Sequence, residues 1–100
     1  MTRPVLTTPV ADADIADAFA WNEVRVRGHG SDFLAELAAT FSFLEEFPGA
    51  YLKMRGETRR AVVLRFPYGV FHLVDPDSTS VTGVLHFRRD PPAWPVNTDV

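Results

Sequence analysis

The sequence contains no cysteine, and lysine occurs only once, as Lys53, among its 100 residues. The absence of cysteine excludes disulfide bonds and thiolate metal sites. No apolar run approaches the roughly 20 residues of a membrane-spanning helix, and the first segment, MTRPVLTTPV, lacks the apolar stretch of a signal peptide. We therefore expect a single cytoplasmic domain over residues 1–100, with a core over about 5–90, a proline-rich tail over 91–100 and no membrane partner.

Acidic residues outnumber basic ones, and the formal net charge of −3 argues against a general nucleic-acid binder. Residues 1–50 hold eight acids and three bases, whereas residues 51–100 hold seven bases and five acids. The bases of the second half gather in two places, which are Lys53, Arg55, Arg59, Arg60 and Arg65, then Arg88 and Arg89. This asymmetry is typical of a surface that meets an anionic partner, although the same charges would also simply keep a surface hydrated.

Two amphipathic helices are predicted in the first half. Thr8 is a candidate N-cap and Pro9 fits the first helical position, and an apolar stripe follows at Ala11, Ile15, Ala18, Phe19 and Val26. Gly28 and Gly30 then break the chain, and Ser31 can cap a second helix over residues 32–47. The apolar face of that helix comprises Phe33, Leu34, Leu37, Phe41, Leu44 and Phe47.

The first helix also carries a smaller apolar face, at Trp21 and Val24. We expect this face to pack on the second helix, although a partner protein could cover it instead.

Residues 58–66, TRRAVVLRF, predict a strand, and residues 51–57 predict a loop. Alternation would direct Val62, Leu64 and Phe66 toward the helices, and the set Arg59, Ala61, Val63 and Arg65 toward the other face. Pro67 cannot donate to a central ladder, so the strand should end in a turn over residues 66–69.

With further strands at 5–7, 69–74 and 80–87, the predicted class is α+β in the order β-α-α-β-β-β. In this arrangement a helical hairpin packs on a small, mainly antiparallel sheet.

The same alternation predicts a basic face. In the strand over residues 80–87 it groups His86 and Arg88, and this face would continue that of Arg59 and Arg65. Guanidinium groups suit phosphate oxygens, and histidine can transfer a proton near neutral pH. Such a face could promote cleavage of RNA, in which the 2′-hydroxyl of the RNA itself attacks the phosphate. Arg65, His86 and Arg88 would be the catalytic residues. Any exposed sheet face needs polar residues, however, so an enzyme is only one interpretation.

No metal site or cofactor is expected. If Val74 pairs with Val81, Gly83 lies opposite His72, and His86 is then roughly 10 Å away, too far to share one ion. His72 is therefore interpreted as a half-exposed strand residue. No Walker loop or dinucleotide fingerprint occurs in the sequence.

Two aromatic residues near the basic clusters, Tyr68 and Trp94, could stack on bases. The favoured interpretation is that Tyr68 closes the end of the sheet and Trp94 holds the tail.

Several segments together carry a family resemblance. RRAVVLRFPYGVFHLV contains an arginine-rich entry into RFPY, VTGVLHFRRDPPAWP ends in H-x-R-R-D-P-x-x-W, and ADADIADAFAW and FLAELAATFSFLEEFPGAY precede them. In this order and spacing, over roughly residues 5–94, the sequence resembles the RelE/ParE superfamily of toxins from type II toxin–antitoxin modules, in its plasmid-stabilisation, ParE-like branch.

The resemblance implies a bacterial cytoplasmic toxin that its cognate antitoxin neutralises, and that meets operator DNA only through the antitoxin. RelE-like members cut mRNA on the ribosome, and ParE-like members poison DNA gyrase. The single lysine and the negative net charge favour a toxin that binds gyrase over a ribosome-dependent endoribonuclease. A non-toxic remnant that acts only as an interaction module is the remaining alternative. The candidate target- or antitoxin-binding residues are Arg59, Arg60, Arg65, Tyr68, Arg88, Arg89 and Trp94.

Overall fold

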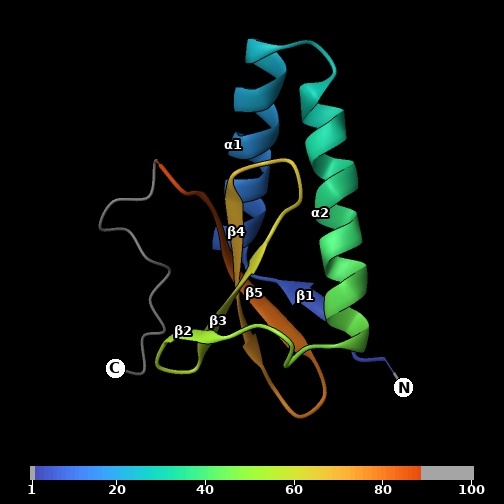
Figure 1. The fold of residues 1–100 in the computed structure, drawn as a ribbon, viewed down its shortest axis with the longest axis vertical. Helices are drawn as coiled ribbons and strands as arrows, with labels where there is room; N and C mark the ends of the chain where they lie inside the picture. The colour runs from blue at the N-terminus through green and yellow to red at the C-terminus, as the bar shows by residue number, and fades with distance from the viewer. Residues whose placement is uncertain (1, 89–100) are drawn as a thin grey trace.

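The computed structural model describes residues 2–88. Its elements are β1 (Val5–Thr7), α1 (Pro9–Arg25), α2 (His29–Glu46), β2 (Lys53–Arg55), β3 (Thr58–Val62), β4 (Tyr68–Val74) and β5 (Thr79–His86). Within these residues the strands form one sheet in the order β1-β5-β4-β3-β2, in which β1 runs parallel to β5 and the other pairs are antiparallel. The helices lie side by side as a hairpin whose turn is at the top of Figure 1. The predicted α+β class and element order are confirmed.

α1 begins where its local signals predict. The Thr8 side chain accepts a hydrogen bond from the backbone N–H of Ala11 at 3.1 Å, and Pro9 occupies the first helical turn. The predicted packing of the smaller apolar face on α2 is wrong, because Val24 is 86% exposed. Trp21 instead makes a T-shaped contact with the His86 ring of β5, and the Arg25 guanidinium lies over the Trp21 ring.

α2 begins at His29, before the predicted cap Ser31, because a side chain from α1 takes over the capping role. Gly28 is left-handed, with φ 91°, and offers no side chain to the helix start. The Glu23 carboxylate accepts hydrogen bonds from the N–H of Gly28, at 3.0 and 3.1 Å, and from the N–H of Gly30 at 3.0 Å. Gly30 also lets the helices approach, since a Cβ there would lie 2.8 Å from the Phe19 ring.

The predicted sidedness of β3 is wrong for Val62 and Leu64, whereas Phe66, in the turn after the strand, packs against the core as predicted. Ala61 and Val63 belong to the core against the helices, whereas Val62 is 44% exposed and Leu64 is 68% exposed. Both alternating sets contain apolar residues, so alternation alone could not decide which set faces the helices. The strand also ends at Val62, so the turn precedes the predicted one and takes Leu64 out of the ladder.

β2 lies where a loop was expected. Lys53 pairs with Arg59 and Arg55 with Thr58 across a turn in which Gly56 has φ 57°. A strand of three residues is too short to show a period in the sequence.

The predicted register of the last hairpin is also wrong, because Val74 pairs with Thr79 rather than Val81, and the register shifts between Phe71 and His72. Such a bulge adds one residue to one strand, so the residues after it face the opposite side of the sheet from the side that simple alternation predicts.

Candidate functional site

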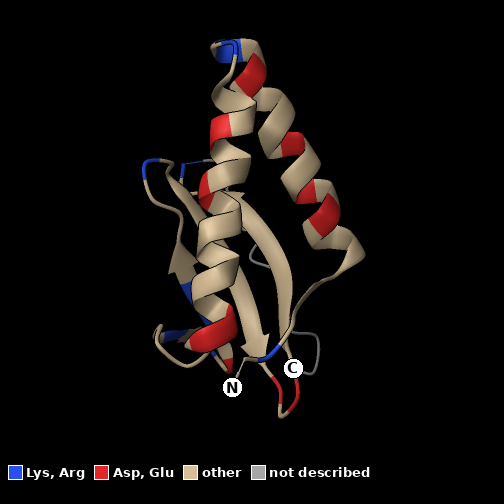
Figure 2. Cartoon of the chain, turned by 90° about the vertical axis from the view of Figure 1, so that its right-hand side faces the viewer, with Lys and Arg blue, Asp and Glu red and all other residues tan. Residues whose placement is uncertain are grey.

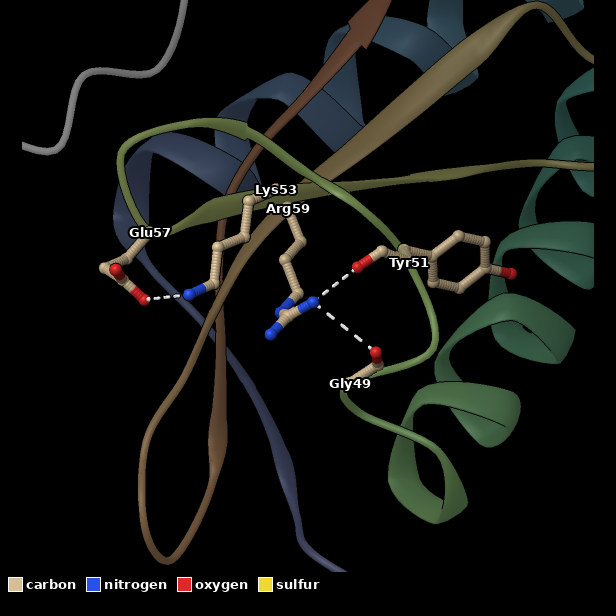
Figure 3. Close-up of polar contacts among 5 residues, drawn as sticks. All are labelled: Gly49, Tyr51, Lys53, Glu57 and Arg59. Carbon is tan, nitrogen blue, oxygen red and sulfur yellow. Dashed lines mark hydrogen bonds and ion pairs between the residues drawn. The ribbon is translucent and has the colours of Figure 1, made fainter.

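Arg59 was predicted to lie on an open basic face, but the structure gives its side chain a local role. Its guanidinium donates hydrogen bonds to the carbonyls of Tyr51, at 2.6 Å, and Gly49, at 3.4 Å. These bonds tie the loop after α2 to β3 (Figure 3). In the same view, Lys53 forms an exposed ion pair with Glu57 at 3.0 Å. Nη1 of Arg59 is therefore engaged with backbone acceptors.

Arg60 lies on the sheet face that is turned away from the helices, because it alternates with the core residue Ala61. Its guanidinium carbon is 5.0 Å from the centre of the Phe87 ring. Its side chain also runs over Gly69, where a Cβ would lie 2.8 Å from the Arg60 Cδ. The side chains of Arg60 and Arg59 thus lie on opposite sides of the sheet.

Arg65 lies in the turn between β3 and β4, with a left-handed backbone (φ 69°). Its Nε is 2.9 Å from Oε2 of Glu36 on α2, and the Arg65 side chain is 66% exposed. A left-handed conformation is unfavourable for a residue with a Cβ. Arg65 is therefore presented on a strained turn and held by one carboxylate.

His86 is buried in the layer between helices and sheet. Its ring makes T-shaped contacts with those of Trp21, at 5.5 Å between centroids, and Tyr68, at 5.0 Å. Its Nδ1 accepts a hydrogen bond from the N–H of Arg88 at 3.0 Å, and Arg88 itself is exposed beyond the end of β5. The alternation grouped His86 with Val84 and Ala61 correctly, but the helices cover this side, so the expected open face with Arg59, Arg65 and Arg88 does not form.

Tyr68 is a core residue rather than an exposed stacking platform. It is 2% exposed, its ring lies 4.8 Å from that of Phe33, and its hydroxyl accepts a hydrogen bond from the Asn22 amide at 3.3 Å. This position agrees with the interpretation that Tyr68 closes the sheet. Arg89, Trp94 and the proline-rich tail lie outside the described residues.

His72 is fully buried, which corrects the prediction of a half-exposed residue. Its Nδ1 lies 3.0 Å from the carbonyl of Val70, so this nitrogen carries the proton, and Nε2 has no hydrogen-bond partner among residues 2–88. Burial lowers the pKa of His72, the nearby Arg59 charge lowers it further, and the Val70 carbonyl opposes the shift. Nor does this part of the chain gather three or more histidine or acidic side chains suited to a metal ion.

Asp14 closes the outer edge of β5 where the short β1 no longer pairs with it. Its carboxylate accepts a hydrogen bond from the N–H of Val84 at 3.0 Å. Burial raises the pKa of Asp14, the Val84 bond opposes the shift, and the neighbouring Asp17 adds to it. These two acids, with Tyr68 and His86, line a hollow of about 60 Å³, which is too small for a nucleotide or peptide segment.

The feature that sequence reasoning missed is an apolar groove between α2 and β3. Its lining comprises Glu36, Ala39, Thr40, Phe43, Tyr51, Val62 and Leu64, and its volume is about 270 Å³. Phe43 is 42% exposed and stacks on the exposed Phe47, so apolar surface continues along α2. We call this feature the α2–β3 groove. The reversed sidedness of β3 hid it, because Val62 and Leu64 were assigned to the core.

Charge is divided between the two layers of the fold. Figure 2 shows Asp and Glu mainly along both helices, and Lys and Arg mainly on the loops and strands at its left and at the helix–helix turn. Arg65 and Glu36 bring one charge of each kind together beside the α2–β3 groove. The α2–β3 groove is therefore an accessible apolar surface with a charged rim.

Comparison with known proteins gives a structural match only. No protein-family model matches the sequence, and no curated protein matches it. A chain in a solved structure of the chromosomal ParDE toxin–antitoxin system from P. aeruginosa superposes with a TM-score of 0.74, covering 85% of this chain and 96% of that chain. The two chains share one fold. Because only 11% of the aligned residues are identical, the match carries no site residue across. In the described part of this chain, neither helix is long and apolar enough to cross a membrane.

Proposed function

We propose that this protein is the toxin of a type II toxin–antitoxin module, that it acts in the cytoplasm, and that a cognate antitoxin neutralises it. The observation that carries the proposal is the fold shared with the ParDE chain, which extends over most of both chains. The sequence segments that resemble the RelE/ParE superfamily favour the same proposal. In this proposal the antitoxin, not the toxin, contacts operator DNA.

We further propose that the toxin arrests growth by binding its target, with DNA gyrase as the favoured target. The placement of the candidate nuclease residues supports binding over catalysis. Of the three candidate catalytic residues, Arg65 is paired with Glu36 and His86 is enclosed by two aromatic rings, whereas Arg88 is exposed. A proton-transfer residue must reach the reacting atoms, and His86 has little open surface from which to do so.

Controlled expression in bacteria tests the proposal. Induction of this chain alone should stop growth, and co-expression of the product of the neighbouring gene should restore it. Absence of a growth defect would favour the alternative of a non-toxic interaction module.

Translated mRNA should remain intact while growth is arrested. Cleavage within codons that Arg65→Ala and His86→Ala both abolish, without unfolding the domain, would replace the binding mechanism with an endoribonuclease.

A further inference from the structure

The α2–β3 groove has the properties of a docking surface for another polypeptide. Three of its lining residues, Phe43, Val62 and Leu64, are large apolar side chains that remain substantially exposed. Exposed apolar side chains that gather around one hollow, rather than scattering singly, indicate an interaction site. The bonds from Arg59 to the carbonyls of Gly49 and Tyr51 hold one wall of this groove in place.

Arg65 at the groove's rim has an unfavourable backbone conformation, and its guanidinium pairs with Glu36 and lies 6.0 Å from the centre of the Phe66 ring. Glycine would occupy a left-handed turn position without strain, yet the chain has arginine there, with φ 69°. The ion pair with Glu36 offers little compensation, because the Arg65 side chain is 66% exposed and exposed pairs contribute little stability. A strained residue that presents a charge beside an apolar groove points to a binding role.

Glu36 is placed to stand in for a partner's carboxylate. It belongs to the lining of the groove, comes from α2 rather than from the turn, and binds Arg65 through one oxygen at 2.9 Å. Its side chain is 22% exposed, so it can turn toward water if another carboxylate replaces it. Such an exchange preserves the charge pairing of Arg65 while the apolar residues become covered.

We propose that the α2–β3 groove receives an amphipathic, acidic segment of the antitoxin, and that one carboxylate of this segment displaces Glu36 from Arg65. The inference rests on the proposed function and adds the chemistry of the partner and the residue that competes with it. The apolar side chains of the segment cover Phe43, Val62 and Leu64, and its acidic residue pairs with Arg65. Glu36 then acts as an internal competitor that limits affinity, and removing its charge strengthens the complex.

The test measures, by titration calorimetry, the Kd between the full-length chain and the purified product of the neighbouring gene. Glu36→Gln should tighten binding by roughly threefold to fivefold, the scale of an exposed ion pair. Arg65→Gln should weaken binding by about tenfold, and Leu64→Ser by about fivefold, as expected of residues central to an interface. Thermal unfolding of each variant verifies that the fold is retained.

Matched controls separate this exchange from a general effect of charge. Glu45→Gln removes the same charge from the opposite side of α2, since nine residues correspond to two and a half turns. Arg27→Gln removes one positive charge from the turn between the helices. Both controls should leave the Kd within about twofold of the wild-type value.

The outcomes separate the docking proposal from the proposed function. If the wild-type chain forms no complex and its toxicity is not relieved, the proposed function fails and the docking surface fails with it. If the complex forms but Glu36→Gln binds no more tightly than the wild type, the carboxylate exchange is wrong and the proposed function is unaffected. If Leu64→Ser and Arg65→Gln also bind normally, the groove is not the docking site.

Discussion

The carboxylate of Glu23 is the feature of the helical hairpin that we expect to matter most for stability. Glu23 lies in the last turns of α1. Its two oxygens accept hydrogen bonds from the N–H of Gly28, at 3.0 and 3.1 Å, and one of them also accepts a hydrogen bond from the N–H of Gly30, at 3.0 Å, at the start of α2. These N–H groups are among those that a helix leaves without internal partners, and Gly28 has no side chain to cap them. Glu23→Ala therefore removes the cap of one helix by changing a residue of the other.

The size of the effect follows from the interactions lost. Loss of an N-terminal cap costs about 1 kcal/mol, and a carboxylate near the positive end of a helix contributes about 0.3–1 kcal/mol more. We therefore expect Glu23→Ala to lower the free energy of unfolding by about 2 kcal/mol. For a domain of this size such a loss lowers Tm by about 8–16 °C. Glu23→Gln keeps one acceptor oxygen and should lose about half as much.

Urea unfolding followed by far-UV circular dichroism measures this loss. The control is Glu46→Ala, which removes an exposed carboxylate from the last turn of α2, near the negative end of the helix dipole. This control should leave stability unchanged or raise it slightly. The capping argument is refuted if Glu23→Ala costs less than about 0.5 kcal/mol, or no more than the control.

Two further predictions concern stability. Burial lowers the pKa of His72, so the unfolded chain takes up a proton more readily than the folded one. The free energy of unfolding should therefore be constant above the ordinary histidine pKa of about 6.5 and should fall as the pH decreases below it. His72→Gln should flatten the dependence of the urea midpoint on pH between 5 and 8, His29→Gln should retain it, and equal slopes in both variants would contradict the assignment. Gly30→Ala should lower the free energy of unfolding by about 1–3 kcal/mol, although alanine normally favours a helix, because its Cβ would lie 2.8 Å from the Phe19 ring and 2.9 Å from the Phe19 carbonyl oxygen. Gly49→Ala, whose Cβ would meet nothing within 4 Å, is the control, and similar thermal unfolding of both variants would disprove this close contact.

Features of the fold that depend on neighbouring residues in the sequence could be predicted. Thr8 and Pro9 mark the start of α1 because a cap and its first turn are adjacent in the chain. Glu23 could not be identified as the cap of α2, because its role depends on how the hairpin closes. β2 was missed because a three-residue strand has no period, and it forms by pairing with β3 across a turn.

The candidate site could be predicted less well, because alternation groups residues without telling which side is covered. Ala61 and His86 do share a side of the sheet, but it is the side beneath the helices. The exposed positions of Val62 and Leu64, and hence the α2–β3 groove, follow only when that choice is known. Arg59 illustrates a second limit, since nothing in the sequence reveals that its guanidinium binds the carbonyls of Gly49 and Tyr51.

The most direct test of the central claim is the supercoiling activity of purified DNA gyrase with and without this protein. We expect supercoiling to fall as the protein is added, and to recover when the product of the neighbouring gene is added in equal amount. Unchanged supercoiling at concentrations above that of gyrase, with growth still arrested in cells, would contradict gyrase as the target.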